Sequence, residues 1–201
     1  VGSTQVHIRN KDFLNVSIPY PPLPEQKKIA SILTTVDDKI SSIDQQIQQT
    51  EQLKKGLMEK LLTEGIGHTE FKETEIGRIP KGWDYCPLGR NVNLMGGYAF
   101  KSKDSQESGV KWLKIANVGH LKVVWDAKSY LPIEFAKQHK KFVLNEGDIV
   151  IAMTRPILGR KLKITYIQKH DSGSLLNQRV GKFVFLNMSM LPAFFYYLVQ
   201  G

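Results

Sequence analysis

The sequence predicts an α+β fold made of one long coiled-coil α-helix and one mainly-β or α+β domain. A heptad pattern of apolar residues occupies residues 24–64, which is the template of a coiled-coil helix. Short strand-like segments separated by Gly, Asn and Asp follow residue 76. Residues 1–75 carry nine Lys and Arg against eleven Asp and Glu, whereas residues 76–201 carry 19 against eight. Such a basic segment is typical of a domain that binds a polyanion, although a soluble basic domain without such a partner has the same composition.

Residues 1–23 are expected to be extended, with a polar turn at Asn10-Lys11-Asp12. Prolines recur over residues 19–24, which disfavours a helix and predicts a rigid, polyproline-like connector. An SH3-binding peptide has a similar composition, but here the prolines lead directly into a helical pattern. We therefore favour the connector.

The heptad pattern predicts a single helix from Pro24 to about Thr63. Pro24 followed by Glu25 is typical of a helix start. Gly65 and Gly67 follow the last apolar position and predict the end of the helix. At 1.5 Å per residue the helix would extend roughly 60 Å.

One face of this helix is expected to be a coiled-coil seam. Its apolar positions alternate at spacings of four and three: Ile29, Leu33, Val36, Ile40, Ile43, Ile47, Leu57 and Leu61. Thr50 and Lys54 interrupt the seam, and such interruptions set register and orientation. A single helix cannot bury its own seam, so the sequence predicts a second helix from another chain or from sequence not present here.

The remaining chain is expected to be a polar linker at residues 65–75 and a domain at residues 76–201. The predicted strands are Val110 to Ile115, Val123 to Trp125, Asp148 to Ala152, Lys161 to Ile167 and Gly181 to Phe185. Short helices are expected over Pro132 to Lys141 and Leu191 to Leu198, the latter with aromatic residues in the core. The predicted aromatic core also includes Trp83, Trp112, Trp125 and Phe142.

Several classes of protein are disfavoured. The chain has one cysteine, Cys86, which excludes a disulfide framework and a multi-cysteine metal site. It has no run of eighteen apolar residues and no secretory layout at its N-terminus. We therefore expect a cytoplasmic protein without a metal or a membrane anchor.

Several motifs, taken in order, resemble the specificity subunits of Type I restriction-modification systems. They are GSTQ at 2–5, KDF at 11–13, PPLPEQ at 21–26, the heptad helix, IGRIPKGW at 76–83, GGYAFK at 96–101 and GDI at 147–149. The resemblance implies two target-recognition domains that alternate with two helices paired as an antiparallel coiled coil. Here the order is domain end, helix, domain beginning. That order fits a fragment from the middle of a subunit, or a half-subunit or circularly permuted form in which residues 1–23 complete the 76–201 domain. We favour the half-subunit or permuted form, because it leaves no open sheet edges.

Loops of the basic domain combine residues that bind phosphates with residues that read base edges. The candidate DNA-binding residues are Gln5, His7, Tyr98, Lys101, Lys103, Thr154, Arg155, Arg160, Lys161, Asn177, Gln178 and Arg179. For any single lysine a solvated surface turn is the favoured interpretation, whereas for Arg155, Arg160 and Arg179 as a group we favour DNA contact. His120 and His139 have no metal-ligand spacing and are expected at the surface.

The expected function is to recognise one half of a bipartite double-stranded DNA target. The resemblance implies adenine-methyltransferase subunits that dock along the helices and bind S-adenosylmethionine, restriction-motor subunits, and a homodimer through an antiparallel helix pair. No catalytic residues and no cofactor are expected in this chain, which lacks a Gly-x-Gly-x-x-Gly or Walker loop. Two alternatives are a stand-alone dimeric DNA-binding regulator and a coiled-coil scaffold that binds RNA or an acidic protein.

Overall fold

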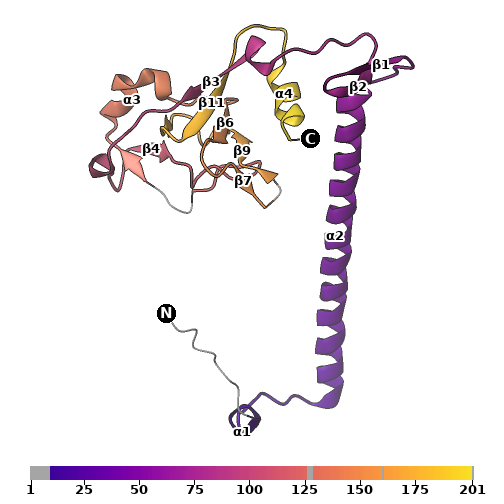
Figure 1. Cartoon of the computed structure of the whole chain (residues 1–201). Helices are drawn as coiled ribbons and strands as arrows, with labels where there is room; N and C mark the ends of the chain where they lie inside the picture. The colour runs from indigo at the N-terminus through magenta and orange to yellow at the C-terminus, as the bar shows by residue number, and fades with distance from the viewer. Residues whose placement is uncertain (1–9, 126–128, 160, 201) are drawn as a thin grey trace. The chain divides into compact units, whose positions relative to one another are not determined.

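The computed structural model of the chain describes residues 10–125, 129–159 and 161–200 (Figure 1). It divides into two units, Val1–Gly56 and Leu57–Gly201. The α-helical and β-rich parts expected from the sequence are both present, which confirms the α+β fold. Within the described residues, no helix combines the length and apolar character needed to cross a membrane.

A short helix, α1 (Asn10–Leu14), replaces the expected polar turn. Asn and Asp favour the first turn of a helix as well as tight turns, so the same residues support either conformation. The apolar residues from Phe13 to Tyr20 are all exposed. Gln5 and His7, which were predicted to contact DNA, lie outside the described residues.

The long helix α2 (Leu23–Thr63) confirms the predicted helix to within one residue. At its start the Pro22 carbonyl accepts hydrogen bonds from the Glu25 and Gln26 amides, at 2.9 and 3.0 Å. At its end Gly65 has a φ of +69°, the left-handed conformation that terminates helices. Local sequence signals therefore determine both ends of α2.

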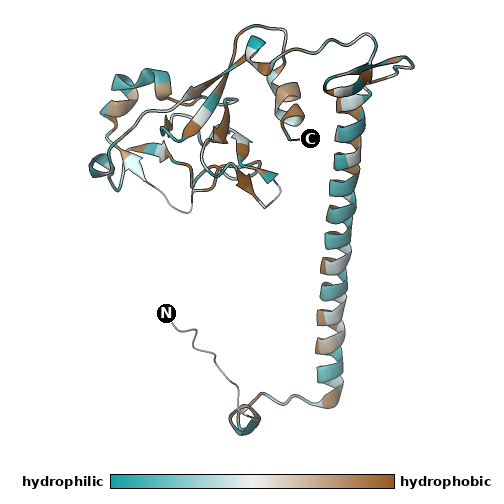
Figure 2. Cartoon of the chain, viewed as in Figure 1, coloured by the Kyte–Doolittle hydropathy of each residue, from teal (hydrophilic) through white to brown (hydrophobic). Residues whose placement is uncertain are grey.

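No residue of α2 is buried. The eight predicted seam residues are 43–58% exposed, and apolar positions recur along the length of the helix in Figure 2. The seam is thus an apolar stripe that no described part of this chain covers.

A hairpin of β1 (Phe71–Thr74) and β2 (Gly77–Pro80) follows the helix. It occupies much of residues 65–75, where the sequence predicted only a linker. The Thr74 hydroxyl donates to the Gly77 carbonyl at 2.6 Å, which closes the turn. Ile79 and Pro80 are buried, so apolar residues beyond the polar stretch hold the hairpin in place.

The basic domain is built on a four-stranded antiparallel sheet. Its strands, in spatial order, are β3 (Val92–Gly96), β11 (Val180–Phe185), β6 (Ile149–Ala152) and β9 (Ile164–Tyr166). Successive side chains point to opposite faces of a sheet, so the two faces have different cores. The predicted strands at Asp148 to Ala152 and Gly181 to Phe185 are confirmed, and the one at Lys161 to Ile167 is divided between β8 and β9.

Helix α4 (Pro192–Leu198) packs on one face of this sheet through Phe195 and Tyr196. The Phe195 ring lies 4.7 Å from the ring of Phe183, and the Tyr196 ring lies 4.3 Å from that of Tyr166. The prediction that the aromatic residues of this helix belong to the core is confirmed for Phe195 and Tyr196, which are buried, and is wrong for Phe194 and Tyr197, which lie on the exposed side of the helix. The core on the other face consists of Leu113, Val118, Leu144, Val150, Ala152, Ile167, Leu176 and Val180.

A second sheet of three short strands completes the domain. It has β4 (Val110–Leu113) at its centre, with β10 (Leu175–Leu176) parallel and β5 (Tyr130–Leu131) antiparallel to it. The remaining elements are η1 (Leu88–Arg90), η2 (Ser102–Asp104), α3 (Glu134–Gln138), η3 (Lys140–Phe142), β7 (Ile157–Leu158) and β8 (Lys161–Leu162). The helix expected over Pro132 to Lys141 is therefore two short helices.

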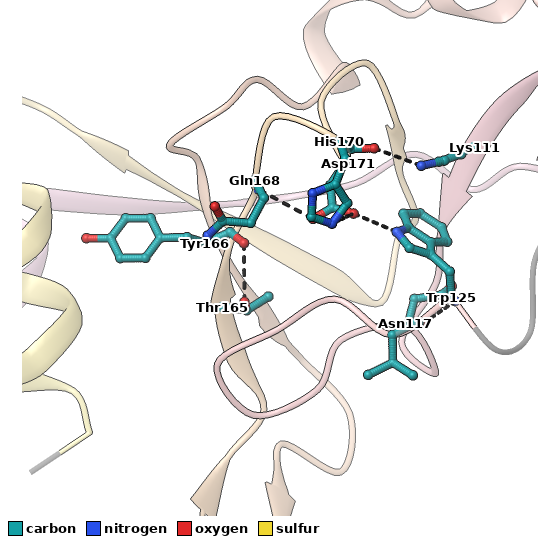
Figure 3. A network of polar contacts seen from close by, with 9 residues as sticks. Lys111, Asn117, Trp125, Thr165, Tyr166, Gln168, His170 and Asp171 are labelled. Atoms are coloured by element: carbon teal, nitrogen blue, oxygen red, sulfur yellow. Dashed lines mark hydrogen bonds and ion pairs between the residues drawn. The ribbon is translucent and has the colours of Figure 1, made fainter.

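The predicted strand at Val123 to Trp125 is wrong. Val123 makes only an isolated bridge to Val118. Trp125 instead donates its indole N–H to the buried Asp171 carboxylate at 2.6 Å (Figure 3). A nearby bond from Lys111 Nζ to the His170 carbonyl, 2.8 Å, ties β4 to the same turn. Of the four aromatic residues predicted as core, Trp112 is buried, whereas Trp83, Trp125 and Phe142 are half-buried.

Candidate nucleic-acid interface

Four segments meet at one end of the four-stranded sheet. Gly96, Gly181, Ile151 and Ile164 lie side by side across its strands. At this end of the sheet the strands β3 and β6 end, whereas the strands β11 and β9 begin. The strand order and register therefore place Gly97 and Tyr98 at the same end as residues 153–156, 161–163 and 177–179. These segments hold most of the described residues that the sequence predicted to contact DNA, whereas Lys101 and Lys103 follow Phe100, which packs in the core of the second sheet.

The loop after β3 contacts the loop before β11 through its backbone. The Tyr98 amide donates to the Leu176 carbonyl at 2.9 Å, and the Gln178 amide donates to the Tyr98 carbonyl at 3.0 Å. A Cβ atom on Gly97 would lie 2.3 Å from the carbonyl oxygens of Leu176 and Asn177. Glycine is therefore required where these two loops meet.

The loop before β11 also contacts the segment after β6. The Met153 amide donates to the Arg179 carbonyl at 3.0 Å. Two residues later Arg155 adopts a φ of +50°, which is uncommon for a residue other than glycine. The Lys163 amide then donates to the Pro156 carbonyl at 2.6 Å. The segments form a continuous row joined by backbone hydrogen bonds.

Most of the described candidate side chains are exposed. They are Tyr98, Lys101, Lys103, Thr154, Arg155, Lys161, Gln178 and Arg179. Asn177 is half-buried, and its Oδ1 accepts a hydrogen bond from the Arg179 amide at 3.2 Å. Asn177 therefore shapes the loop that presents its two neighbours. Arg160 lies outside the described residues.

Aromatic rings hold Tyr98 in place at this surface. Its ring lies 4.2 Å from that of His139, 4.9 Å from that of Phe100 and 5.5 Å from that of Phe142. His139 is half-buried within this cluster, so the expectation that it is a surface residue is wrong. The cluster gives the loop after β3 a rigid base, which a site needs if it is to read base edges.

The surface at this end of the sheet is basic. From Ile149 to His170 the sequence contains no Asp or Glu. Lys163 and Lys182 are engaged elsewhere, since their ammonium groups bond the Ile115 carbonyl and the Asp148 carboxylate at 2.8 and 3.0 Å. Exposed cations at this end include Arg155, Lys161 and Arg179, and the exposed Lys122 lies nearby, since the Leu121 amide donates to the Ile164 carbonyl at 3.1 Å.

Asp148 does not form a nuclease-like pair with Lys161. Its Oδ2 accepts hydrogen bonds from the Asn145 amide at 2.8 Å and from Lys182. It precedes β6, whereas Lys161 lies beyond the other end of that strand. Within the described ranges no three His, Cys, Asp or Glu residues are grouped as a metal site.

Comparisons with known proteins agree with the motifs. Residues 1–52 match the family model described as the Type I restriction modification DNA specificity domain. The whole chain aligns at 43% identity with the Type I restriction enzyme MjaVIII specificity subunit of Methanocaldococcus jannaschii, over 47% of that protein. Along its whole length the chain is therefore similar to the specificity subunits of Type I restriction-modification systems.

Other matches are shorter or less similar in sequence. The EcoAI specificity subunit of Escherichia coli is 39% identical over 105 residues, which are 52% of this chain and 18% of that protein. A solved structure aligns with a TM-score of 0.52. It is described as the structural basis of complex assembly and conformational transition of the type I R-M system. It is 16% identical and covers 99% of this chain and 47% of that one, so it shows the fold alone. The chain spans less than half the length of these relatives.

Sequence reasoning did not single out two exposed apolar residues of the same sheet end, Ile157 and Leu158. They lie between Arg155 and Lys161, and they were missed because the candidate residues of this segment were chosen for charge and polarity. An apolar pair flanked by cations in a segment without carboxylates is the signal that identifies them.

Proposed function

We propose that this chain recognises one half of a bipartite DNA target for a Type I restriction-modification complex. The observation that carries the proposal is the convergence of the candidate segments at one sheet end, where the exposed cations include Arg155, Lys161 and Arg179. Positive charge on one surface attracts the phosphate backbone. The names of its relatives, which are specificity subunits, support the same function.

The proposed surface divides into residues that position DNA and residues that read it. Lys101, Lys103 and Lys161 carry compact charges suited to phosphates, whose contacts carry no sequence information. Arginine pairs bidentately with guanine, and glutamine with adenine. Arg179 and Gln178 are exposed on the central loop of the row, and we assign base reading to them, with Arg155 beside them.

Helix α2 is proposed to set the distance between two such surfaces. Its exposed seam would pair with the seam of a second copy in antiparallel orientation, which would hold two recognition domains apart at fixed spacing. Adenine-methyltransferase subunits that bind S-adenosylmethionine would dock along the paired helices, together with restriction-motor subunits. The chain itself would supply recognition and no chemistry.

The deciding experiment combines selection of DNA with a binding assay. The chain would first be used to select duplexes from a random library, and the selected duplex would then be footprinted. Two protected segments separated by unprotected bases are expected. One continuous protected operator would indicate a regulator instead, and no preference among duplexes would indicate a scaffold.

A pull-down separates a specificity subunit from any other DNA-binding dimer. The purified chain is expected to retain an adenine methyltransferase of a Type I system and to direct its methylation to the selected site. Failure to bind that enzyme, combined with unchanged methylation sites, would contradict the proposal.

A further inference from the structure

The hairpin of β7 and β8 extends from the candidate interface and carries apolar residues. Ile157 pairs with Leu162, and Leu158 pairs with Lys161. These two strands form a pair of their own, separate from the four-stranded sheet (Figure 1). Leu162 packs against the core on the α4 face and so anchors the base of the hairpin.

The two residues of β7 are exposed although they are large and apolar. Ile157 is 62% exposed and Leu158 is 63% exposed. Exposed cations lie on both sides of them, Arg155 before β7 and Lys161 in β8. The nearest acidic residues in the sequence are Asp148 and Asp171, well outside the hairpin. Leu158 and its cross-strand partner Lys161 share one face of the ribbon, and an exposed apolar side chain beside a cation fits a polyanion that also presents an apolar group.

We propose that this hairpin enters the major groove and that Leu158 contacts the C5-methyl group of a thymine. This inference rests on the proposed function and assigns it a specificity-determining contact. The thymine methyl is the apolar group that base edges present in the grooves. Phosphates and sugars have no comparable apolar group that an aliphatic side chain could contact.

The dimensions favour the major groove. Paired strands lie about 4.8 Å apart, and the major groove is about 12 Å wide, enough for a two-stranded ribbon with its side chains. The minor groove, about 6 Å wide, does not admit a ribbon without deformation. Lys161 pairs with Leu158 and lies on the same face of the ribbon, so its longer side chain would reach a phosphate at the edge of the groove while the leucine contacts a base.

The test replaces thymine by deoxyuridine, which removes only the methyl group. In the duplex selected by the chain, each thymine would be replaced in turn and the dissociation constant of the full chain measured. At one or two positions the wild type is expected to bind the uracil duplex about fourfold more weakly, the factor that corresponds to one buried methyl group. Leu158→Ala should bind both duplexes equally, whereas Ile157→Ala, whose side chain lies on the opposite face of the ribbon, should keep the discrimination.

Leu186→Ala is the matched control, because Leu186 is 55% exposed and follows β11 at the opposite end of the sheet. It should keep the wild-type preference for thymine. Equal wild-type binding of thymine and uracil at every position would overturn the inference, as would a Leu158→Ala variant that still discriminates. If the wild type remains selective for its target in those cases, the proposed function stands. If it selects no duplex, both fail.

Discussion

Helix α2 is defined by local sequence signals, whereas the basic domain is defined by contacts between segments that are distant in sequence. Every residue of α2 is unburied, and its limits follow from local signals at Pro22 and Gly65. The domain has cores on both faces of its main sheet, and its candidate loops are joined by bonds between distant segments, such as Tyr98 and Gln178. Changes in the helix should therefore act on assembly, whereas changes in the domain should act on loop geometry and folding.

The largest effect is expected when the seam receives a charge. Ile40→Glu or Ile47→Glu would place an unpaired carboxylate in the helix–helix contact, which should weaken pairing by about 3–5 kcal/mol. Light scattering should then give the mass of a monomer at concentrations where the wild type is a dimer. The thermal transition of the domain should not change.

Gln45→Glu is the control for that prediction, since Gln45 lies away from the seam positions of α2. It introduces the same charge and should leave the dimer intact. A seam variant with wild-type mass would show that the apolar stripe is not the pairing surface.

The next largest effect concerns the close approach of two domain loops. Gly97→Ala would place a Cβ atom against two backbone carbonyls, at 2.3 Å from each, and backbone cannot move aside as a flexible side chain can. We expect a loss of about 2–3 kcal/mol in the free energy of unfolding, measured by urea denaturation followed by near-UV circular dichroism. Gly82→Ala, which meets no atom within 4 Å, should be neutral. Similar stability of the two variants would contradict the packing described for Gly97.

The same contrast explains how much of the fold and of the candidate interface could be predicted from the sequence. Helix α2 was predicted to within one residue because heptad spacing, Pro24 and Gly65 act on their own neighbours. Most of the described loop residues are exposed, as expected of surface loops, but the meeting of their segments at one sheet end depends on the pairing of β3, β11 and β6. Tyr98 and Asn177 are about 80 residues apart in sequence yet form a bridge. Register of that kind is set by the whole core, and no local pattern encodes it.

Within the candidate interface, arginine and lysine should differ. Arg179→Ala, which removes a proposed bidentate contact to guanine, should weaken binding to the selected duplex by about 1–3 kcal/mol and relax preference at one base position. Lys103→Ala should weaken binding to all duplexes alike and reduce the slope of affinity against salt concentration by about one. Titrations with selected and random duplexes at several salt concentrations measure both effects. Equal losses on the two duplexes for Arg179→Ala would contradict direct reading of a base by that residue.

The smallest expected effect is a dependence of stability on pH, which should arise in the domain and not in α2. Helix α2 contains no tyrosine, whereas the domain core contains one whose pKa is strongly raised. Burial against the sheet, with further contributions from the Tyr166 and Tyr197 phenols, raises the pKa of Tyr196 from 10.0 to about 12. Below pH 10 Tyr196 is protonated in both folded and unfolded chains, so its contribution to stability is complete. Between pH 10 and 12 the unfolded chain loses this proton first, and the contribution declines as the pH rises through the folded value. At pH 11 the loss is about 1.4 kcal/mol. Tyr196→Phe should remove that part of the decline between pH 9 and 11 when unfolding is followed in near-UV circular dichroism. A variant whose stability declined as steeply as that of the wild type would show that the buried phenol is not the group that titrates.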